Sequence, residues 1–155
     1  GAGLGKTPII AAETGKFSLS GGIEIDEELV QEGNRNFLKV NKSKKDKNLF
    51  LVQGNVESPG DIENLMSTIK GLGINPGTAT LFIFNKNSYG PEVLKNSLIQ
   101  IEKHFSSIVY LYQNPIHHYV LTSMNYIEFG QDSKSFTAHK NYKYRLFFKH
   151  VYAKE

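Results

Sequence analysis

The chain has 155 residues, an apolar share of 39% and a formal net charge of +3, which predict one domain with a real hydrophobic core. The absence of cysteine excludes disulfides, thiolate metal sites and a cysteine nucleophile. No apolar run is long enough to span a membrane, and no secretory signal is visible. We therefore expect no membrane partner and a cytoplasmic or virion-associated protein.

The first seven residues, Gly-Ala-Gly-Leu-Gly-Lys-Thr, are similar to the end of a phosphate-binding loop. That mechanism needs a strand before the loop and a full helix after it, and the sequence predicts neither. Residues 1–16 are therefore expected to be an N-terminal segment, flexible or left over from cloning. A single α/β domain is predicted at 17–155.

The next thirty residues predict a hairpin, a short helix and a loop. Residues 17–26 alternate between apolar and polar around Gly21-Gly22, which is typical of a hairpin or a bulged strand. The acidic residues 26–28 favour a short helix start, and Gly33 is expected to end or interrupt that helix. The centre of the basic segment 35–47 has no apolar residue and is expected to be an exposed loop.

The most secure prediction is a strand–helix–strand–helix–strand unit over residues 49–112. The apolar runs 49–52, 79–84 and 107–112 suit strands buried on both faces. Apolar residues recur at helical spacing between them, after Pro59 and after Pro91. The unit is expected to have parallel strands joined by crossover helices.

The helix after residue 58 has a well-formed start. Ser58 can cap it, Pro59 takes the first helical position, and Asp61 is expected to reach back as the acid of a capping box.

After residue 114, two antiparallel strands are predicted at 118–129 and 142–152, joined by a polar loop. In the last strand apolar residues alternate with basic ones, which is typical of a half-buried strand with a solvated basic face. The predicted fold is thus α/β, with a mixed sheet of about five to seven strands. It has a parallel βαβαβ core, two main helices and antiparallel strands at both ends.

No constellation of catalytic or metal-binding residues stands out. His117 and His118 would point to opposite faces of a strand, so they are not expected to chelate one metal. The triplet at 132–134, Asp-Ser-Lys, lacks the nearby earlier acid that a Mg²⁺ nuclease site needs. We therefore expect no catalytic residue, no metal site, no cofactor and no enzymatic activity.

Basic residues gather in the segments 35–47 and 139–149, which indicates contact with phosphates or with an acidic partner. The residues that would make this contact are Lys42, Lys44, Lys45, Lys47, Lys143, Arg145 and Lys149.

The element order over residues 17–112 resembles the STAS fold of anti-anti-sigma-type regulators. In that family a regulatory serine lies in a turn between a strand and a helix, and Glu57-Ser58-Pro59-Gly60 matches that turn. The resemblance implies that Ser58 is a phosphorylation site at a helix N-terminus and that the chain binds a kinase-like partner.

The favoured interpretation of function is a non-enzymatic interaction or assembly module, such as a structural component of a virion. The aromatic-rich C-terminal strands could supply an edge or a face for a protein partner or for self-association. Two alternatives stay open, a STAS-like regulator switched at Ser58 and a nucleic-acid-binding domain that uses the two basic segments.

Overall fold

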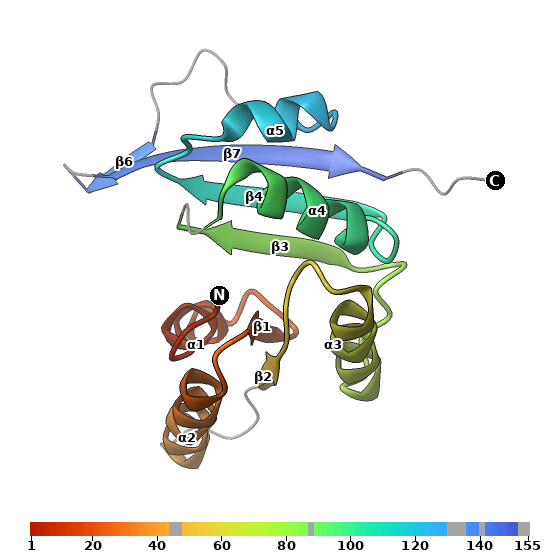
Figure 1. The fold of residues 1–155 in the computed structure, drawn as a ribbon. Coiled ribbons are helices and arrows are strands. Elements are labelled where there is room, and N and C mark those ends of the chain that lie inside the picture. Colours follow the sequence, from red (N-terminus) through yellow and green to blue (C-terminus); the bar gives the residue numbers. More distant parts are fainter. Residues whose placement is uncertain (44–47, 87–88, 130–135, 140–141, 152–155) are drawn as a thin grey trace. The chain divides into compact units, whose positions relative to one another are not determined.

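A computed structural model describes residues 1–43, 48–86, 89–129, 136–139 and 142–151 of the chain (Figure 1). The chain forms two compact units, which we call unit 1 (Gly1–Ile74) and unit 2 (Asn75–Glu155). The predicted α/β class is confirmed. The prediction of one sheet is wrong, because the described strands form one sheet of two strands and another of five.

Unit 1 alternates helices and strands. In chain order its elements are α1 (Lys6–Glu13), β1 (Ser20–Glu24), α2 (Glu27–Ser43), β2 (Leu49–Gln53) and α3 (Pro59–Gly71). β1 and β2 run parallel, with Ser20 beside Leu49 and Glu24 beside Gln53.

The hairpin predicted at residues 17–26 is therefore wrong, because this stretch holds a single strand. Its two glycines do not form a turn. A Cβ on Gly21 would stand 2.2 Å from the ring of Phe50, and one on Gly22 would stand 2.4 Å from the Cβ of Ala2. The glycines allow other parts of unit 1 to approach the strand closely.

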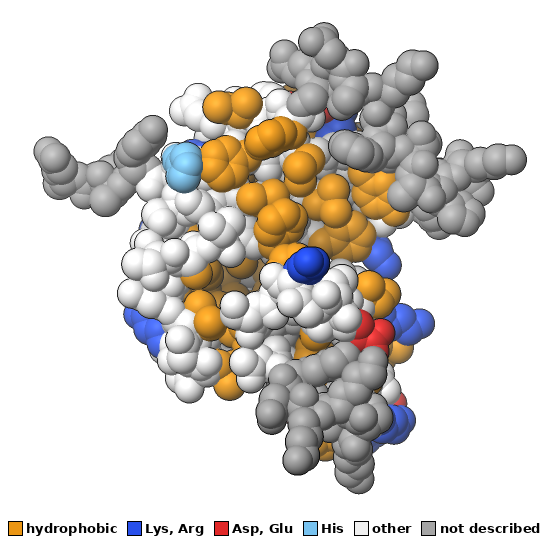
Figure 2. Space-filling view, turned by 180° about the vertical axis from the view of Figure 1, so that it is seen from behind, with side chains coloured by type: hydrophobic (Ala, Val, Ile, Leu, Met, Phe, Trp, Pro, Cys, Tyr) orange, Lys and Arg blue, Asp and Glu red, His pale blue; other side chains and the backbone are white. Residues whose placement is uncertain are grey.

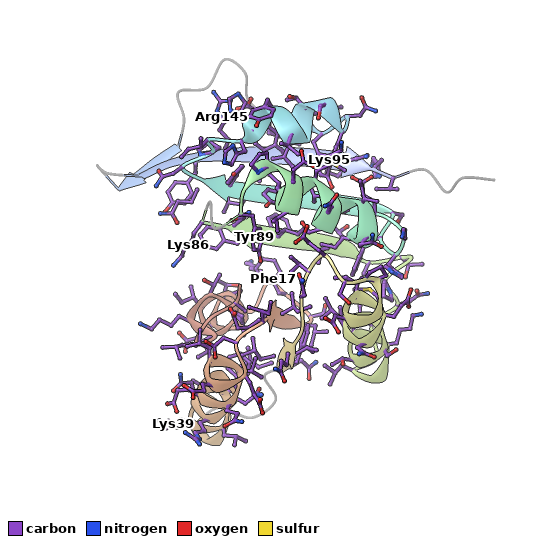
Figure 3. All side chains as sticks on the ribbon, viewed as in Figure 1. Phe17, Lys39, Lys86, Tyr89, Lys95 and Arg145 are labelled. Atoms are coloured by element: carbon purple, nitrogen blue, oxygen red, sulfur yellow. The ribbon has the colours of Figure 1, made fainter. Side chains whose placement is uncertain are left out.

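Helix α2 continues past Gly33, although the sequence analysis predicted that the helix would end or be interrupted there. Gly33 is required by a close approach, since a Cβ there would stand 2.6 Å from Cδ2 of Leu51. Val30, Phe37 and Leu51 form the buried core on this side of α2. The basic segment 35–47 is therefore helical up to Ser43, and Lys39 projects outward from α2 (Figure 3).

The start of α3 is confirmed in part. Ser58 is the N-cap, its Oγ accepts the N–H of Asp61 at 3.3 Å, and Pro59 opens the helix. The Asp61 carboxylate does not bind back to the Ser58 N–H, which donates to the carbonyl of Asn55. Instead, Asp61 Oδ2 accepts the N–H of Asn55 at 2.9 Å and so holds the loop between β2 and α3.

Unit 2 is a mixed sheet with two helices. Its elements are β3 (Thr80–Asn85), α4 (Pro91–Ile101), β4 (Ser107–Gln113), α5 (His118–Ser123), β5 (Ile127–Glu128), β6 (Phe136–His139) and β7 (Tyr142–His150). The strand order is β3-β4-β7-β5, and β6 also pairs with β7. β3 and β4 are parallel and joined by α4, as predicted, whereas β7 is antiparallel to both β4 and β5.

Two predictions on this half of the chain are wrong. Residues 118–129 form α5 and the two-residue β5 instead of one strand. A continuous βαβαβ core over 49–112 is also absent, since β2 pairs with β1 and β3 belongs to the other sheet. The described residues hold five helices in place of the two main ones that were expected. None of these five is long and apolar enough to cross a membrane.

The predicted solvated basic face of β7 is in fact the helix-covered face. Phe147 on this face is fully buried, because α4 and α5 lie on the same side of the sheet (Figure 1). Its two described cations have acidic partners. Arg145 Nε lies 3.3 Å from Glu128, and Lys149 Nζ lies 2.7 Å from Glu102.

The Lys149–Glu102 pair links β7 to the end of α4 inside unit 2. Both side chains are only 16% exposed, and the ammonium also lies 5.3 Å from the ring centre of Tyr126. We expect Glu102→Gln to lower the free energy of unfolding by about 3 kcal/mol, because it leaves a buried ammonium without its counter-charge. Urea denaturation followed by circular dichroism measures this change.

The matched control is Glu32→Gln, which breaks the exposed pair between Arg35 and Glu32 on α2. Exposed pairs contribute little, so this variant should stay within about 0.5 kcal/mol of the parent chain. Equal losses of stability in the two variants would mean that the Lys149–Glu102 pair contributes no more to the free energy of unfolding than an exposed pair does.

Candidate functional site

A glycine-rich turn, Gly1–Gly5, leads directly into α1. The N–H of Ala2 donates to the carbonyl of Ile23 at 3.1 Å, which fastens the turn to β1. Gly3 and Gly5 adopt positive φ values of 55° and 74°, and Gly5 is the N-cap of α1. The expectation that no full helix follows the turn is therefore wrong. The division into a segment 1–16 and a domain 17–155 stays a prediction.

The glycines of this turn meet two different needs. A Cβ on Gly5 would stand 2.4 Å from Cε1 of Phe37, so the absence of a side chain lets α2 pack against the turn. A Cβ on Gly3 would meet no atom within 4 Å. The backbone of Gly3 therefore borders open space, where a ligand could approach it closely.

Glu24 ends β1 with its carboxylate against this turn. The side chain is 6% exposed, and Oε2 accepts the N–H of Gly3 at 2.8 Å. Oε1 accepts the N–H groups of Ile25 at 2.9 Å and Asp26 at 3.2 Å. Burial acts to raise the pKa of Glu24, but the hydrogen bonds from Gly3, Asp26 and Ile25 favour the charged form and help to lower this pKa.

The end of β2 lies beside the end of β1. The N–H of Gly54 donates to the Glu24 carbonyl at 2.9 Å. Ile25, the residue directly after Glu24, is 67% exposed. Ligands of open α/β sheets bind outside the carboxyl ends of the strands. The glycine-rich turn, the Glu24 carboxylate and the apolar Ile25 side chain meet at that position in unit 1.

The described members of the predicted sites lie on different elements of the two units. Ser58 caps α3, and Lys42 lies in α2. Lys143, Arg145 and Lys149 lie in β7 of unit 2, where the last two are paired with acids. Lys44, Lys45 and Lys47 are outside the described residues, as is the triplet at 132–134.

His118 and His150 make side-chain hydrogen bonds within unit 2. His117 and His118 stand at the start of α5, not in a strand, and Nδ1 of His118 lies 3.1 Å from the Pro115 carbonyl oxygen. Nδ1 of His150 lies 3.0 Å from the Ser107 hydroxyl. Among the described residues, no group of three or more His, Asp or Glu side chains could hold a metal ion.

Sequence reasoning missed Gly3, Gly5 and Glu24 as site residues. A usable signal was present. A Gly-x-Gly-x-Gly turn opens a helix, and an acidic residue follows about twenty residues later at the end of the next strand. Because no strand could be read before Gly1, the turn was interpreted as a tail.

Two solved structures are similar to this chain. One, from Streptococcus agalactiae, is described as a protein in the NADB-Rossmann superfamily; it has 13% sequence identity and a TM-score of 0.59. The other, an uncharacterized protein from Listeria monocytogenes serotype 4b, has 14% identity and a TM-score of 0.62. They match 98% and 99% of this chain, which spans 60% of the length of each. No protein-family model and no curated protein matches the sequence.

The fold is Rossmann-like. The resemblance to STAS domains is therefore wrong, as is the regulatory role that it implied for Ser58. The same comparisons overturn the interpretation as an assembly or virion component. The interpretation as a nucleic-acid-binding domain stays a prediction. Physically, Ser58 is accounted for by helix capping, and Arg145 and Lys149 are neutralised within unit 2.

Gly5 in the glycine-rich turn and Gly15, which follows α1, have similar φ values and allow a paired test. Gly15, at φ 66°, has open space where a Cβ would stand, whereas Gly5 faces the Phe37 ring. We expect Gly15→Ala to cost about 1 kcal/mol, the usual price of a left-handed alanine. Gly5→Ala should cost about 3 kcal/mol, because the clash with Phe37 adds to that strain. Thermal and urea denaturation measure both, and equal costs would contradict the close approach of α2.

The Glu24 carboxylate should make stability depend on pH. Its pKa in the folded chain is lowered from the ordinary 4.5, so the stabilisation is present above that value and is lost as pH falls through the folded pKa. We expect Glu24→Gln to lower stability at pH 7 and to flatten the loss of stability below pH 4.5. Urea denaturation from pH 7 to pH 3 checks this. If the variant lost as much stability below pH 4.5 as the parent chain does, the prediction would be contradicted.

Proposed function

We propose that unit 1 binds a nucleoside cofactor and that the chain is part of a methyltransferase that uses S-adenosylmethionine. The observation that carries this proposal is the contact between the Glu24 carboxylate and the N–H of Gly3 at the open side of the turn. The proposal replaces the sequence-based expectations of no cofactor and no enzymatic activity.

The chemistry of Glu24 suits a ribose. In Rossmann-type sites an acid about twenty residues after the glycine-rich turn accepts hydrogen bonds from ribose hydroxyls. Oε2 of Glu24 accepts the N–H of Gly3, and a carboxylate oxygen can accept more than one hydrogen bond. The exposed Ile25 side chain, one residue further on, offers an apolar surface for the face of an adenine ring.

The charge at the turn favours a nucleoside without phosphates over a dinucleotide. A pyrophosphate is normally held by free N–H groups at the helix N-terminus. Here the N–H of Gly3 is already bound to a carboxylate, and Pro8 supplies no N–H to the first turn of α1. A pyrophosphate at Gly3 would meet the negative Glu24, whereas a cationic sulfonium compound would not be repelled.

The strand order of unit 2 supports the same choice. Dinucleotide domains are built from mostly parallel βαβαβ halves. A mixed sheet with an antiparallel strand inside it departs from that architecture. β7 has this arrangement, since it lies between β4 and β5 and runs antiparallel to both.

In this proposal the residues of unit 1 bind and orient the cofactor. Gly3 lets the cofactor approach the backbone, Glu24 fixes the ribose through its hydroxyls, and Gly5 holds the turn against α2. The cofactor itself would supply a methyl group activated by a sulfonium.

Calorimetric titration of the chain with S-adenosylmethionine, S-adenosylhomocysteine and NAD⁺ tests the proposal. We expect both adenosyl compounds to bind at least tenfold more tightly than NAD⁺. Glu24→Ala should weaken their binding at least tenfold, because the bound ribose loses its acceptor.

The matched control is Glu28→Ala, which removes an exposed carboxylate from the first turn of α2. It should leave the affinity unchanged. Tighter binding of NAD⁺, or equal effects of Glu24→Ala and Glu28→Ala with both variants folded, would contradict the proposal. Binding of neither class of compound would contradict it as well.

A further inference from the structure

The loop that follows β2 carries an asparagine, Asn55, at the same edge of unit 1 as Glu24 and Ile25. β1 and β2 are parallel neighbours with Glu24 beside Gln53, so the loops that leave their carboxyl ends lie side by side. The bond from the Gly54 N–H to the Glu24 carbonyl extends this pairing by one residue. Asn55 comes directly after Gly54, and Ile25 comes directly after Glu24. The half-buried Asn55 therefore lies next to the segment whose apolar side chain would carry the adenine ring.

Three hydrogen bonds hold Asn55 in this loop. Its N–H donates to Oδ2 of Asp61 at 2.9 Å, and its carbonyl accepts the N–H of Ser58 at 3.0 Å. Its side-chain Oδ1 accepts the N–H of Glu57, also at 3.0 Å. Because Ser58 and Asp61 belong to the start of α3, the loop is fastened to the helix. A side chain that is already held in this way loses little conformational freedom when it meets a ligand.

The bond to Glu57 decides which end of the Asn55 amide is left for a ligand. A backbone N–H only donates, so the atom that it reaches is the amide oxygen. The nitrogen Nδ2 then offers two N–H donors and no acceptor, and it has no hydrogen-bond partner among the described residues. Nδ2 is not one of the buried unpartnered polar atoms of the described chain, so it reaches solvent.

The two sides of β1 set the direction in which a nucleoside would lie. The Ile23 carbonyl accepts the N–H of Ala2 in the glycine-rich turn, whereas the next carbonyl, that of Glu24, accepts the N–H of Gly54. Consecutive carbonyl groups of a strand point to opposite edges, so the turn and the loop after β2 flank β1 on opposite sides. A ribose at Glu24, against the turn, therefore leaves the far edge of the purine ring toward Asn55. That edge carries N1.

Purines differ in what N1 can do. In adenine N1 has a free lone pair and accepts a hydrogen bond, whereas in hypoxanthine and guanine N1 carries a hydrogen and donates. An N1–H group placed against Nδ2 of Asn55 would leave two donors facing each other without an acceptor. A site built to bond one such group rejects strongly an analogue that cannot make the bond.

We propose that Asn55 makes the nucleoside site of unit 1 specific for adenine, by donating a hydrogen bond from Nδ2 to N1 of the ring. The inference rests on the proposed function, because it takes the ribose to be held by Glu24. It adds the selection of the base, which Glu24 and the glycine-rich turn do not supply, since they act on the ribose and on the backbone.

Calorimetric titration with S-adenosylhomocysteine and S-inosylhomocysteine tests this selection. The inosyl compound differs only in its base, in which oxygen replaces the amino group and N1 carries a hydrogen. We expect the parent chain to bind the adenosyl compound at least tenfold more tightly. Asn55→Asp keeps the oxygen that accepts the Glu57 N–H and replaces Nδ2 by an acceptor. This variant should shift the ratio of the two dissociation constants at least tenfold toward the inosyl compound.

The matched control is Asn64→Asp, which introduces the same charge at an exposed position of α3. It should leave the ratio of the two dissociation constants unchanged, and circular dichroism confirms that both variants are folded. Equal affinity of the parent chain for the two compounds would overturn the role of Asn55 and leave the proposed function standing. An unchanged ratio in folded Asn55→Asp would do the same. Binding of neither compound would overturn both.

Discussion

The arrangement of unit 1 depends on one hydrogen bond, from the N–H of Gly3 to the carboxylate of Glu24. Gly3 belongs to the turn that opens α1, and Glu24 ends β1, so the bond joins two segments that are distant in the sequence. Two further N–H groups hold the same carboxylate in place. With the turn fixed, Gly5 can receive the Phe37 ring of α2, and the turn, β1 and α2 become one packed body.

The parts of the fold that the sequence predicted correctly are those whose signals are local. The β3–α4–β4 unit needs only two apolar runs and a helical stripe after Pro91, and all three lie within about thirty-five residues. The start of α3 was predicted because Ser58, Pro59 and Asp61 are neighbours in sequence. The alternation along β7 was also visible, but its faces were exchanged, since the acids that neutralise Arg145 and Lys149 lie on other elements.

Three of the errors share a physical cause, which is that a glycine signals conformational freedom without saying why it is needed. Gly21-Gly22 suggested a hairpin, and Gly33 suggested a helix end. In the structure these glycines make room for Phe50, Ala2 and Leu51. The candidate site was missed for the same reason, because the value of Gly3 appears only when Glu24 is seen beside it. A local sequence pattern does not reveal such contacts, because the residues that make them are distant in the sequence.

The distribution of charge then separates the roles of the two units. In unit 1 hydrogen bonds hold a carboxylate in its charged form at the turn, and under the proposed function this charge would select against phosphate and favour a neutral or cationic nucleoside. In unit 2 the described cations of β7 are neutralised on the helix-covered side, which leaves the opposite face without charge. The same alternation that pairs Arg145 and Lys149 with acids therefore leaves the opposite face of β7 apolar. Figure 2, which views the molecule from behind, shows hydrophobic side chains gathered over the strands of unit 2. A change that moved a cation of β7 to the opposite face would disturb both the internal pairing and that surface.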